Sequence, residues 1–296
     1  ASSTALREEN TQFNIIACPG YPELMQNMIT LNNDRKQTAF IIGDSPLTLN
    51  VSNIQAWIQN TNLAQDNGED GLVSSSEYLG VYYPSGFATD LAGESVVVPP
   101  SHMMLRTMIR SDNVSYPWFA PAGVRRGLID NATSIGYIDV ADANTFKSIG
   151  VTVGVRDVLY ADRVNPLTVL PGVGLVAYGQ KTRAASTSAL DRINVSRLTA
   201  YLRLVLDKVA RPFIFEPNDT ITRNQVKSAF ESVLNDIVAK RGLYDYLVVC
   251  DTSNNTPDRI DRNELYVDIA IKPVKAIEFV YIPVRIVNTG ASLTTT

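Results

Sequence analysis

The sequence predicts an α/β domain followed by an α+β domain, and three observations support this. In the first third of the 296 residues, short apolar runs alternate with segments whose apolar residues recur at helical spacing. A small, polar segment at residues 181–189 then changes the composition. The last third reads as two amphipathic helices followed by strands. We therefore expect two domains, covering residues 1–180 and 181–296.

The first domain is expected to be built on strands joined by helices. Pro22 stands at a helix-starting position, Ser52 and Gln55 form a capping-box pattern, and residues 101–109 predict a third helix. Strands separated by amphipathic helices imply right-handed crossovers, so we expect a mostly parallel sheet with flanking helices on both faces. The apolar runs that predict its strands are residues 13–18, 39–43 and 78–83.

The segments that end the first domain are less regular. Residues 116–123 are rich in aromatic residues and proline, which predicts a structured loop. Residues 151–178 read as β-rich, with interruptions at proline and glycine. Residues 181–189 can bury little apolar surface to offset a backbone ordering cost of about 1–2 kcal/mol per residue, so we expect a mobile loop at the domain boundary.

The second domain has the clearest periodicity. Residues 193–209 predict a helix that stops before Pro212, and a short strand is expected at residues 213–215. Thr222 and Gln225 then form a capping-box pattern that opens a second helix. That helix is expected to bury one face and to stop at Gly242; the face comprises Val226, Phe230, Val233 and Ile237. Three strands should follow, at residues 243–250, 265–271 and 277–287.

Composition excludes several classes of function. With 26 basic and 30 acidic residues the net charge is −4, which gives no global attraction to nucleic acid or anionic lipid. No apolar run approaches the roughly 20 residues of a membrane span, and residues 1–10 do not resemble a signal peptide. Cys18 and Cys250 are expected to be buried thiols of a reducing compartment. We expect no nucleic-acid partner and no membrane insertion.

The residues that usually carry chemistry are missing from the sequence or out of place. Neither phosphate-binding glycine motif occurs, and residues 251–256 imitate only the start of a calcium loop. His102 is the only imidazole, and no Gly-x-Ser-x-Gly segment supplies a nucleophile for it. We therefore expect no catalytic, cofactor-binding or metal-binding residues. The alternative is a small-molecule-binding or enzymatic α/β domain whose site lies at the carboxyl edge of the sheet, around His102 or Asp44.

Six further segments are distinctive when they are taken together. They are residues 18–22, 116–123, 165–167, 174–182, 211–219 and 272–279. No segment is diagnostic alone, but their order and content are specific, and they span most of the chain. Together they resemble the tail sheath protein of contractile bacteriophage (myovirus) tails, in its C-terminal portion, a family related to the sheaths of pyocins and type VI secretion systems.

The resemblance implies a structural polymer rather than an enzyme. It implies a first domain with a subtilisin-like fold, without the protease's catalytic segments, and a C-terminal sheath domain facing a tail tube. Family members form stacked hexameric rings that contract, and they assemble with tube, baseplate and tail terminator proteins in the virion after synthesis in the host cytoplasm. Residues 8–18 already resemble the inside of the α/β domain, so the family's N-terminal arm has no counterpart here and we expect a fragment of a longer subunit.

Two sets of residues are expected to make contacts between subunits. The resemblance implies that the end of the chain pairs as a strand with a neighbour, through Val284, Arg285, Ile286, Val287 and Asn288. Pro283 interrupts this strand, which fits an edge position, and the alternative is a locally paired edge strand with a frayed tail.

A second contact is expected on the helix that follows Thr222. Arg223 and Lys227 lie one turn apart and away from the predicted apolar face, so they are candidates to face an acidic tube. The alternative is a solvated face in which Lys227 pairs with Glu231.

Overall fold

The computed structural model describes residues 3–60 and 71–281, and its first part is built on a mixed five-stranded sheet. The strand order is β1-β2-β3-β8-β9, in which β1, β2, β3 and β8 are parallel and β9 runs antiparallel to β8. We call the part built on this sheet the body. The strands are β1 (Ile15–Ala17), β2 (Phe40–Asp44), β3 (Leu79–Tyr83), β8 (Val164–Leu170) and β9 (Gly174–Ala177).

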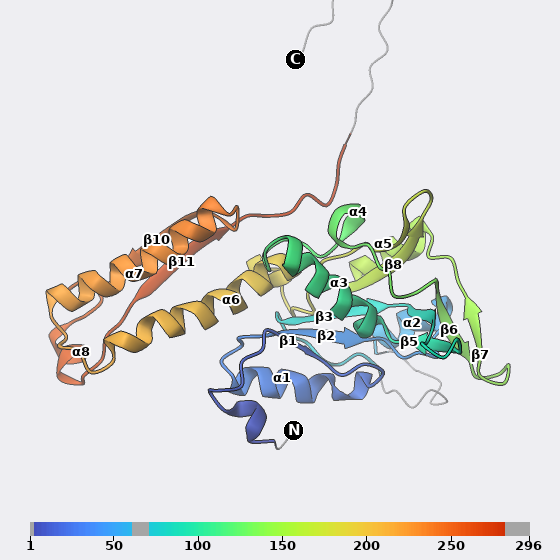
Figure 1. The fold of residues 1–296 in the computed structure, drawn as a ribbon, viewed down its shortest axis with the longest axis horizontal. Helices are drawn as coiled ribbons and strands as arrows, with labels where there is room; N and C mark the ends of the chain where they lie inside the picture. Colours follow the sequence, from blue (N-terminus) through green and yellow to red (C-terminus); the bar gives the residue numbers. More distant parts are fainter. Residues whose placement is uncertain (1–2, 61–70, 282–296) are drawn as a thin grey trace, which may run out of the picture.

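Helices cover both faces of this sheet, as the sequence predicts. Helix α3 packs on β1, β2 and β3, while α1 packs on β2 from the opposite side (Figure 1). Helix α5 packs on β8 and also contacts α2. Short 3-10 turns lie at Ala5–Arg7 and before α1 at Pro22–Leu24. The helices of the body are α1 (Met25–Asp34), α2 (Val51–Ile58), α3 (Pro100–Val114), α4 (Gly123–Arg126) and α5 (Val153–Ala161).

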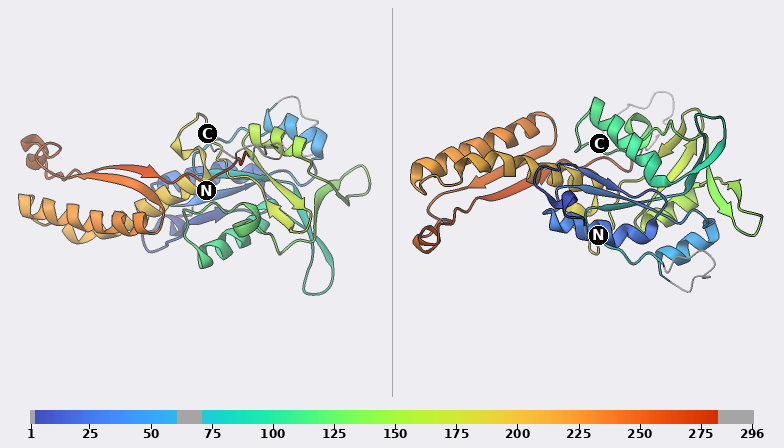
Figure 2. Two further views of the ribbon diagram at one scale, coloured as in Figure 1. Left: turned by 90° about the horizontal axis from the view of Figure 1, so that it is seen from above. Right: turned by 60° about the horizontal axis from the view of Figure 1, so that its bottom comes forward.

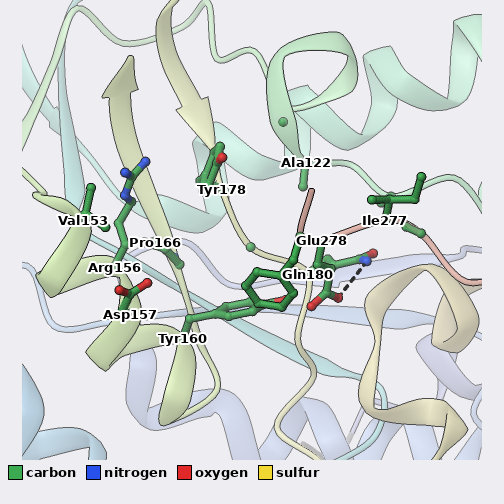
Figure 3. A pocket seen from close by; sticks show the side chains of 15 residues that line it. Ala122, Val153, Arg156, Asp157, Tyr160, Pro166, Tyr178, Gln180, Ile277 and Glu278 are labelled. Carbon is green, nitrogen blue, oxygen red and sulfur yellow. Dashed lines mark hydrogen bonds between the residues drawn. The ribbon is translucent and has the colours of Figure 1, made fainter. Parts of the chain in front are cut away.

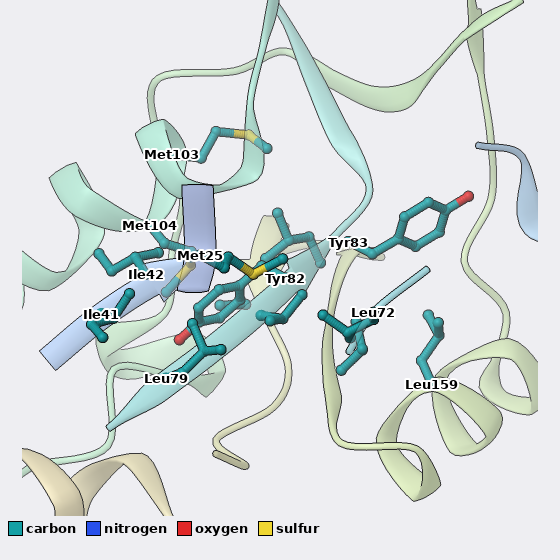
Figure 4. Close-up of a cluster of buried hydrophobic side chains, with 14 of the residues drawn as sticks. Met25, Ile41, Ile42, Leu72, Leu79, Tyr82, Tyr83, Met103, Met104 and Leu159 are labelled. Carbon is teal, nitrogen blue, oxygen red and sulfur yellow. The ribbon is translucent and has the colours of Figure 1, made fainter. Parts of the chain in front are cut away.

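The core of the body lies between the central strands and α3 (Figure 4). Every residue of β2 and β3 is buried, because both strands have neighbours on both sides and helices above and below. Met103 and Met104 of α3 reach this core, together with Met25 of α1. Apart from Asp44 at the end of β2, the two strands carry apolar, aromatic and glycine residues, as a parallel sheet buried on both faces requires.

A second sheet, which the sequence analysis missed, is attached to the body. It is antiparallel, with the strand order β5-β4-β6-β7. Its outer strands are partly exposed and only four residues long, and β7 lacks an apolar run, although β5 carries three consecutive valines at residues 96–98. The strands are β4 (Ser85–Thr89), β5 (Ser95–Val98), β6 (Ser134–Asp139) and β7 (Thr145–Ser148).

The C-terminal elements form an elongated lobe that projects from the body (Figure 2). We use the name lobe for residues 193–273. It has its own hydrophobic cluster, which also takes in Trp118 from the aromatic loop. Helix α6 belongs to both cores, since Ile193 packs in the body and Leu198 in the lobe. The lobe contains α6 (Ile193–Ala210), α7 (Thr220–Ala239), β10 (Leu243–Val249), α8 (Pro257–Asp261) and β11 (Asp268–Pro273).

Both long helices of the lobe lie where the sequence predicted them. The residues predicted to cap the N-termini of α7 and of α2 were wrong. Asp219, not Thr222, caps α7 by accepting a hydrogen bond from the Thr222 N–H at 2.8 Å. Asn50, not Ser52, caps α2 in the same way. A residue at the cap position needs extended backbone angles, which Asp219 and Asn50 adopt, whereas the predicted residues already lie inside their helices.

Other predictions were wrong because long-range contacts override local composition. Helix α5 lies inside the region read as β-rich. Residues 213–215 form no strand, since a 3-10 turn (Arg211–Phe213) leads into an irregular loop. The described part of the third predicted C-terminal strand, residues 277–281, is extended without a strand partner.

The segment at residues 181–189, predicted to be mobile, is held firmly at its start. Thr182 and Ala184 are buried. The N–H of Arg183 donates to the Leu79 carbonyl at 2.8 Å, and its guanidinium donates to the Asp162 carbonyl at 2.8 Å. These contacts join the segment to β3 and to the end of α5. The division of the chain at residue 180/181 stays a prediction.

Candidate assembly surfaces

The two-stranded sheet of the lobe has open edges. Strands β10 and β11 pair only with each other among the described residues, in an antiparallel register that joins Tyr246 to Ile271 and Val248 to Ile269. Helix α7 covers one face by packing on β10. On β10, Tyr244 and Leu247 are both largely exposed. An open edge presents unpaired backbone groups that can accept another strand, so this sheet is a candidate acceptor for a neighbouring chain.

After β11 the chain returns to the body as an extended segment, residues 274–281, which we call the strap. Arg192 fixes it by donating to both carboxylate oxygens of Glu278, at 2.5 Å and 3.3 Å. Gln180 donates to the same carboxylate at 3.1 Å, and Asn194 donates to the Val274 carbonyl at 3.0 Å. A bidentate arginine–carboxylate pair that is partly shielded from water is one of the stronger polar contacts in proteins. The strap is therefore anchored to the body at one side chain.

The strap exposes a run of apolar side chains around the anchored Glu278. Ile277, Phe279, Val280 and Tyr281 are 83%, 68%, 73% and 88% exposed. Within the described residues, no backbone hydrogen bond joins residues 275–281 to another segment. An extended segment with a row of exposed apolar side chains is suited to pairing with a further strand.

A pocket of about 400 Å³ lies between the strap and the body; we call it the strap pocket (Figure 3). Tyr160 of α5 and Tyr178, which follows β9, are aromatic residues of its lining. Arg156 stacks over the Tyr178 ring at 4.8 Å from its centroid. Figure 3 shows Glu278 turned toward Gln180 beside Tyr160.

The expected strand-exchange residues Val284, Arg285, Ile286, Val287 and Asn288 lie outside the described residues. The sequence analysis did not identify the anchor that precedes them. One signal was present: Glu278 is the single acidic residue in the run from Val274 to Tyr281. Its carboxylate points to the body, where it pairs with Arg192.

The two expected tube-facing residues have different environments. Arg223 is buried, and its guanidinium donates to the carbonyl and the side-chain oxygen of Asn218 at 3.2 Å and 3.0 Å. Its predicted exposure was therefore wrong, because the turn before α7 folds back over it. Lys227 is half-buried and forms no ion pair with Glu231 or any other described residue. Only Lys227 keeps the surface access that the prediction assumed.

The residues named for the enzymatic alternative do not form a site together. Asp44 is buried, and its carboxylate accepts hydrogen bonds from the Gly20 N–H at 2.8 Å, the Ser101 N–H at 2.5 Å and the Ser101 hydroxyl at 2.8 Å. Burial raises the pKa of Asp44 to about 6, although these bonds act in the opposite direction. Asp44 thus holds the start of α3, and neither it nor His102 lines the strap pocket.

The structure also bears on metal binding and on membrane insertion. The described residues contain no group of three or more His, Cys, Asp or Glu side chains that could hold a metal ion. Among the helices that the structure describes, none is both long and apolar enough to cross a membrane.

Comparisons with known proteins agree on one family. Residues 185–287 match the family model for the phage tail sheath C-terminal domain. The chain is 35% identical over 234 residues to the tail sheath protein of Vibrio phage KVP40, covering 78% of this chain and 33% of that protein. It is 37% identical over 182 residues to the tail sheath protein of Enterobacteria phage T4, covering 62% of this chain and 26% of that protein.

Solved structures show the same fold. The sheath complex of an extracellular contractile injection system in its contracted state matches with a TM-score of 0.74 at 18% identity, over 93% of this chain and 71% of that chain. The baseplate of the anti-feeding prophage matches with a TM-score of 0.68 at 19% identity, over 95% of this chain and 72% of that chain. A mixed α/β fold shared with contractile sheaths is thereby confirmed.

The described strand edges of the lobe are open, and the fold is one found in contractile sheaths. The chain belongs to the tail sheath family, and it spans about a quarter to a third of the length of the two curated phage relatives compared above.

Proposed function

We propose that this chain is part of the contractile tail sheath of a bacteriophage. In this proposal the subunit polymerises as stacked hexameric rings around the tail tube and contracts to drive the tube through the host envelope, so that the genome can be delivered. It would be a virion component assembled in the host cytoplasm. The observation that carries the proposal is the open sheet of the lobe beside a strap that leads toward residues 284–288.

Strand exchange is the proposed link between subunits. Val284 to Asn288 of one copy would add to an open edge of the β10–β11 sheet of a neighbour, and alternate apolar side chains would contact its exposed face. Each new backbone hydrogen bond contributes on the order of 1 kcal/mol net. One such strand is a weak contact, but every subunit of a lattice makes it, so the links add up.

This arrangement suits contraction. The strap is anchored at Glu278, and the residues that follow would be held only through the neighbour's sheet. The links can therefore stay paired while the bodies change their relative tilt as rigid units. The subtilisin-like fold of the first domain belongs to the same proposal, as a likeness of fold without the protease's chemistry.

The proposed partners are further copies of the subunit, the tail tube, the baseplate and the tail terminator protein. Lys227 is the more accessible candidate for contact with an acidic tube, since Arg223 is held inside the lobe. The chain would act without catalysis and without a cofactor.

The experiment that tests the function is a truncation of the full-length sheath protein. Deleting residues 284–296, which include the whole proposed strand from Val284 to Asn288, should leave a folded monomer that does not form sheaths, as seen by electron microscopy and by sedimentation. A matched control removes the exposed apolar side chain at the β4–β5 turn by Leu91→Asn, which should leave assembly unchanged. Normal sheaths from the truncated protein would refute strand exchange as the link.

A further inference from the structure

The connection between α6 and α7 exposes a phenylalanine at the far end of the lobe (Figure 1). We call residues 211–219 the tip loop. Phe215 is 102% exposed, and its backbone has a φ of +75°. The neighbouring Ile214 is 59% exposed. Among the large apolar side chains that the structure describes, Phe215 combines full exposure with a left-handed backbone.

Both properties of Phe215 are unfavourable for the isolated subunit. Left-handed backbone strains a residue with a bulky side chain, whereas glycine or asparagine adopts it readily. A fully exposed aromatic ring also gains nothing from folding. A residue that combines the two does not stabilise the fold at this position, and such local outliers tend to mark functional contacts.

The rest of the tip loop is braced, so Phe215 is presented on a fixed frame. Asn218 donates to the Glu264 carbonyl at 2.9 Å and accepts from Arg223 at 3.0 Å. Asp219 caps α7, and the Glu216 N–H donates to the Phe213 carbonyl at 3.3 Å. A preorganised loop loses little conformational freedom when its exposed side chain binds.

The strap pocket is a candidate acceptor for the Phe215 ring; it lies beside the body, away from the tip loop. Its volume of about 400 Å³ and its aromatic and apolar lining fit a phenyl ring, and Tyr160, Tyr178 and Phe279 are part of that lining. Gln180 also lines the pocket and is only 4% exposed.

Two arginines beside the strap pocket can complement an acidic residue of the tip loop. Glu216, next to Phe215, forms no ion pair with any described residue. The charged residues of the pocket lining are Arg156, Asp157 and Glu278, and Glu278 is paired with Arg192. Gly123, at the start of α4, also lines the pocket, and Arg125 and Arg126 follow it outside the lining. Burial and the nearby cations Arg125 and Arg241 lower the pKa of Arg126, which indicates a local excess of positive charge.

We propose that Phe215 of one copy inserts into the strap pocket of a second copy, with Glu216 facing Arg125 and Arg126. The inference rests on the proposed polymer and adds a second contact to strand exchange. Because ring and pocket lie on different surfaces of one chain, the contact is head-to-tail and can repeat without closing. One buried ring is far smaller than a stable interface, so the contact acts only within the lattice.

Chemical cross-linking tests the pairing directly. Full-length sheath protein carrying Cys18→Ser, Phe215→Cys and Ala122→Cys would be assembled and treated with a short bismaleimide; the remaining Cys250 is buried. Ala122 lines the strap pocket, so a ladder of covalent multimers is expected. Variants with only one of the two introduced cysteines should give no ladder. Dimers from Phe215→Cys alone would show a tip-to-tip contact, and cross-links to the tube protein would show a tube contact; either result would overturn the proposal.

A substitution separates the contact from folding and from strand exchange. Phe215→Asn removes the ring and suits the left-handed backbone, so the monomer should resist urea at least as well as the original protein. Its critical concentration for sheath assembly should rise about tenfold, whereas the Leu91→Asn control should leave it unchanged. If the unsubstituted protein forms sheaths and Phe215→Asn forms them equally well, the tip contact is wrong while the proposed function stands. If the unsubstituted protein forms no sheaths, the proposed function itself fails.

Discussion

The body and the lobe differ in whether they contain strands that are paired on both sides. In the body, β2 and β3 are flanked by strands on both sides and covered by helices, and all their residues are buried. In the lobe, β10 and β11 pair only with each other among the described residues, with one face covered by α7. The body therefore has fully buried interior strands besides its edge strands, while both strands of the lobe are edge strands. The difference teaches that the central strands of the body are buried by contacts within the chain, whereas the lobe leaves backbone groups available to another strand.

The strongest test of this contrast compares a core residue with an exposed one. Phe40→Ala should lower the free energy of unfolding by about 3–5 kcal/mol, because the ring is fully buried between strands and helices. Leu247→Ala, on the open face of β10, should change it by less than about 0.5 kcal/mol. Urea unfolding of both variants measures this. Similar losses in the two would mean that the lobe face is already covered within one subunit.

The joint between the two parts should be nearly as sensitive. Arg197 of α6 is buried and donates to Asp112 of α3 at 2.5 Å. Arg197→Ala should cost about 3 kcal/mol, since it leaves the Asp112 carboxylate without its partner. Arg203→Ala, on an exposed position of the same helix, is the control and should cost less than about 1 kcal/mol. A double variant, Arg197→Met with Asp112→Leu, should recover most of the loss; failure to recover would contradict the assigned cause.

Part of the pH dependence of the free energy of unfolding should come from Asp44 in the body. The folded pKa of Asp44 is raised to about 6 from an ordinary value near 3.8, so the folded state holds more protons than the unfolded state between these values. The contribution of Asp44 to stability therefore falls as the pH rises from about 4 to about 6, by on the order of 3 kcal/mol. Comparing the unfolding of the original protein and Asp44→Asn at pH 4.5 and pH 7 checks this. A difference between the two proteins that does not change with pH would contradict it.

The smallest expected effect on global stability concerns the strap. Glu278→Gln removes the charge that Arg192 holds, so the strap should leave the body more often. Proteolysis within residues 274–281 should become several-fold faster, while global unfolding changes by less than about 1 kcal/mol. Glu23→Gln, at an exposed position of the body, serves as the control. Unchanged cleavage would mean that backbone contacts, not Glu278, hold the strap.

The same contrast explains which features could be predicted from the sequence. Strands β2 and β3 were found because a strand buried on both faces is largely apolar, and α6 and α7 because one buried face imposes a helical period. The second sheet was missed because its strands are short and partly exposed, as in β5 and β7. No local pattern encodes the pairing of Arg192 with Glu278, which lie 86 residues apart. Residues that would contact another subunit are determined by the partner's surface, so the sequence of one chain gives little local pattern by which to find them.

Helix α6 has a mechanical consequence. It starts in the body at Ile193, ends beside the tip loop at Ala210, and its 18 residues span about 27 Å. An unbroken helix seated in both hydrophobic clusters acts as a stiff lever arm with its fulcrum in the body. A rotation of the body by about 10° would sweep the far end through about 5 Å, given that arm length. Small rotations of the body are thereby converted into displacements at the far end of the lobe along a single element.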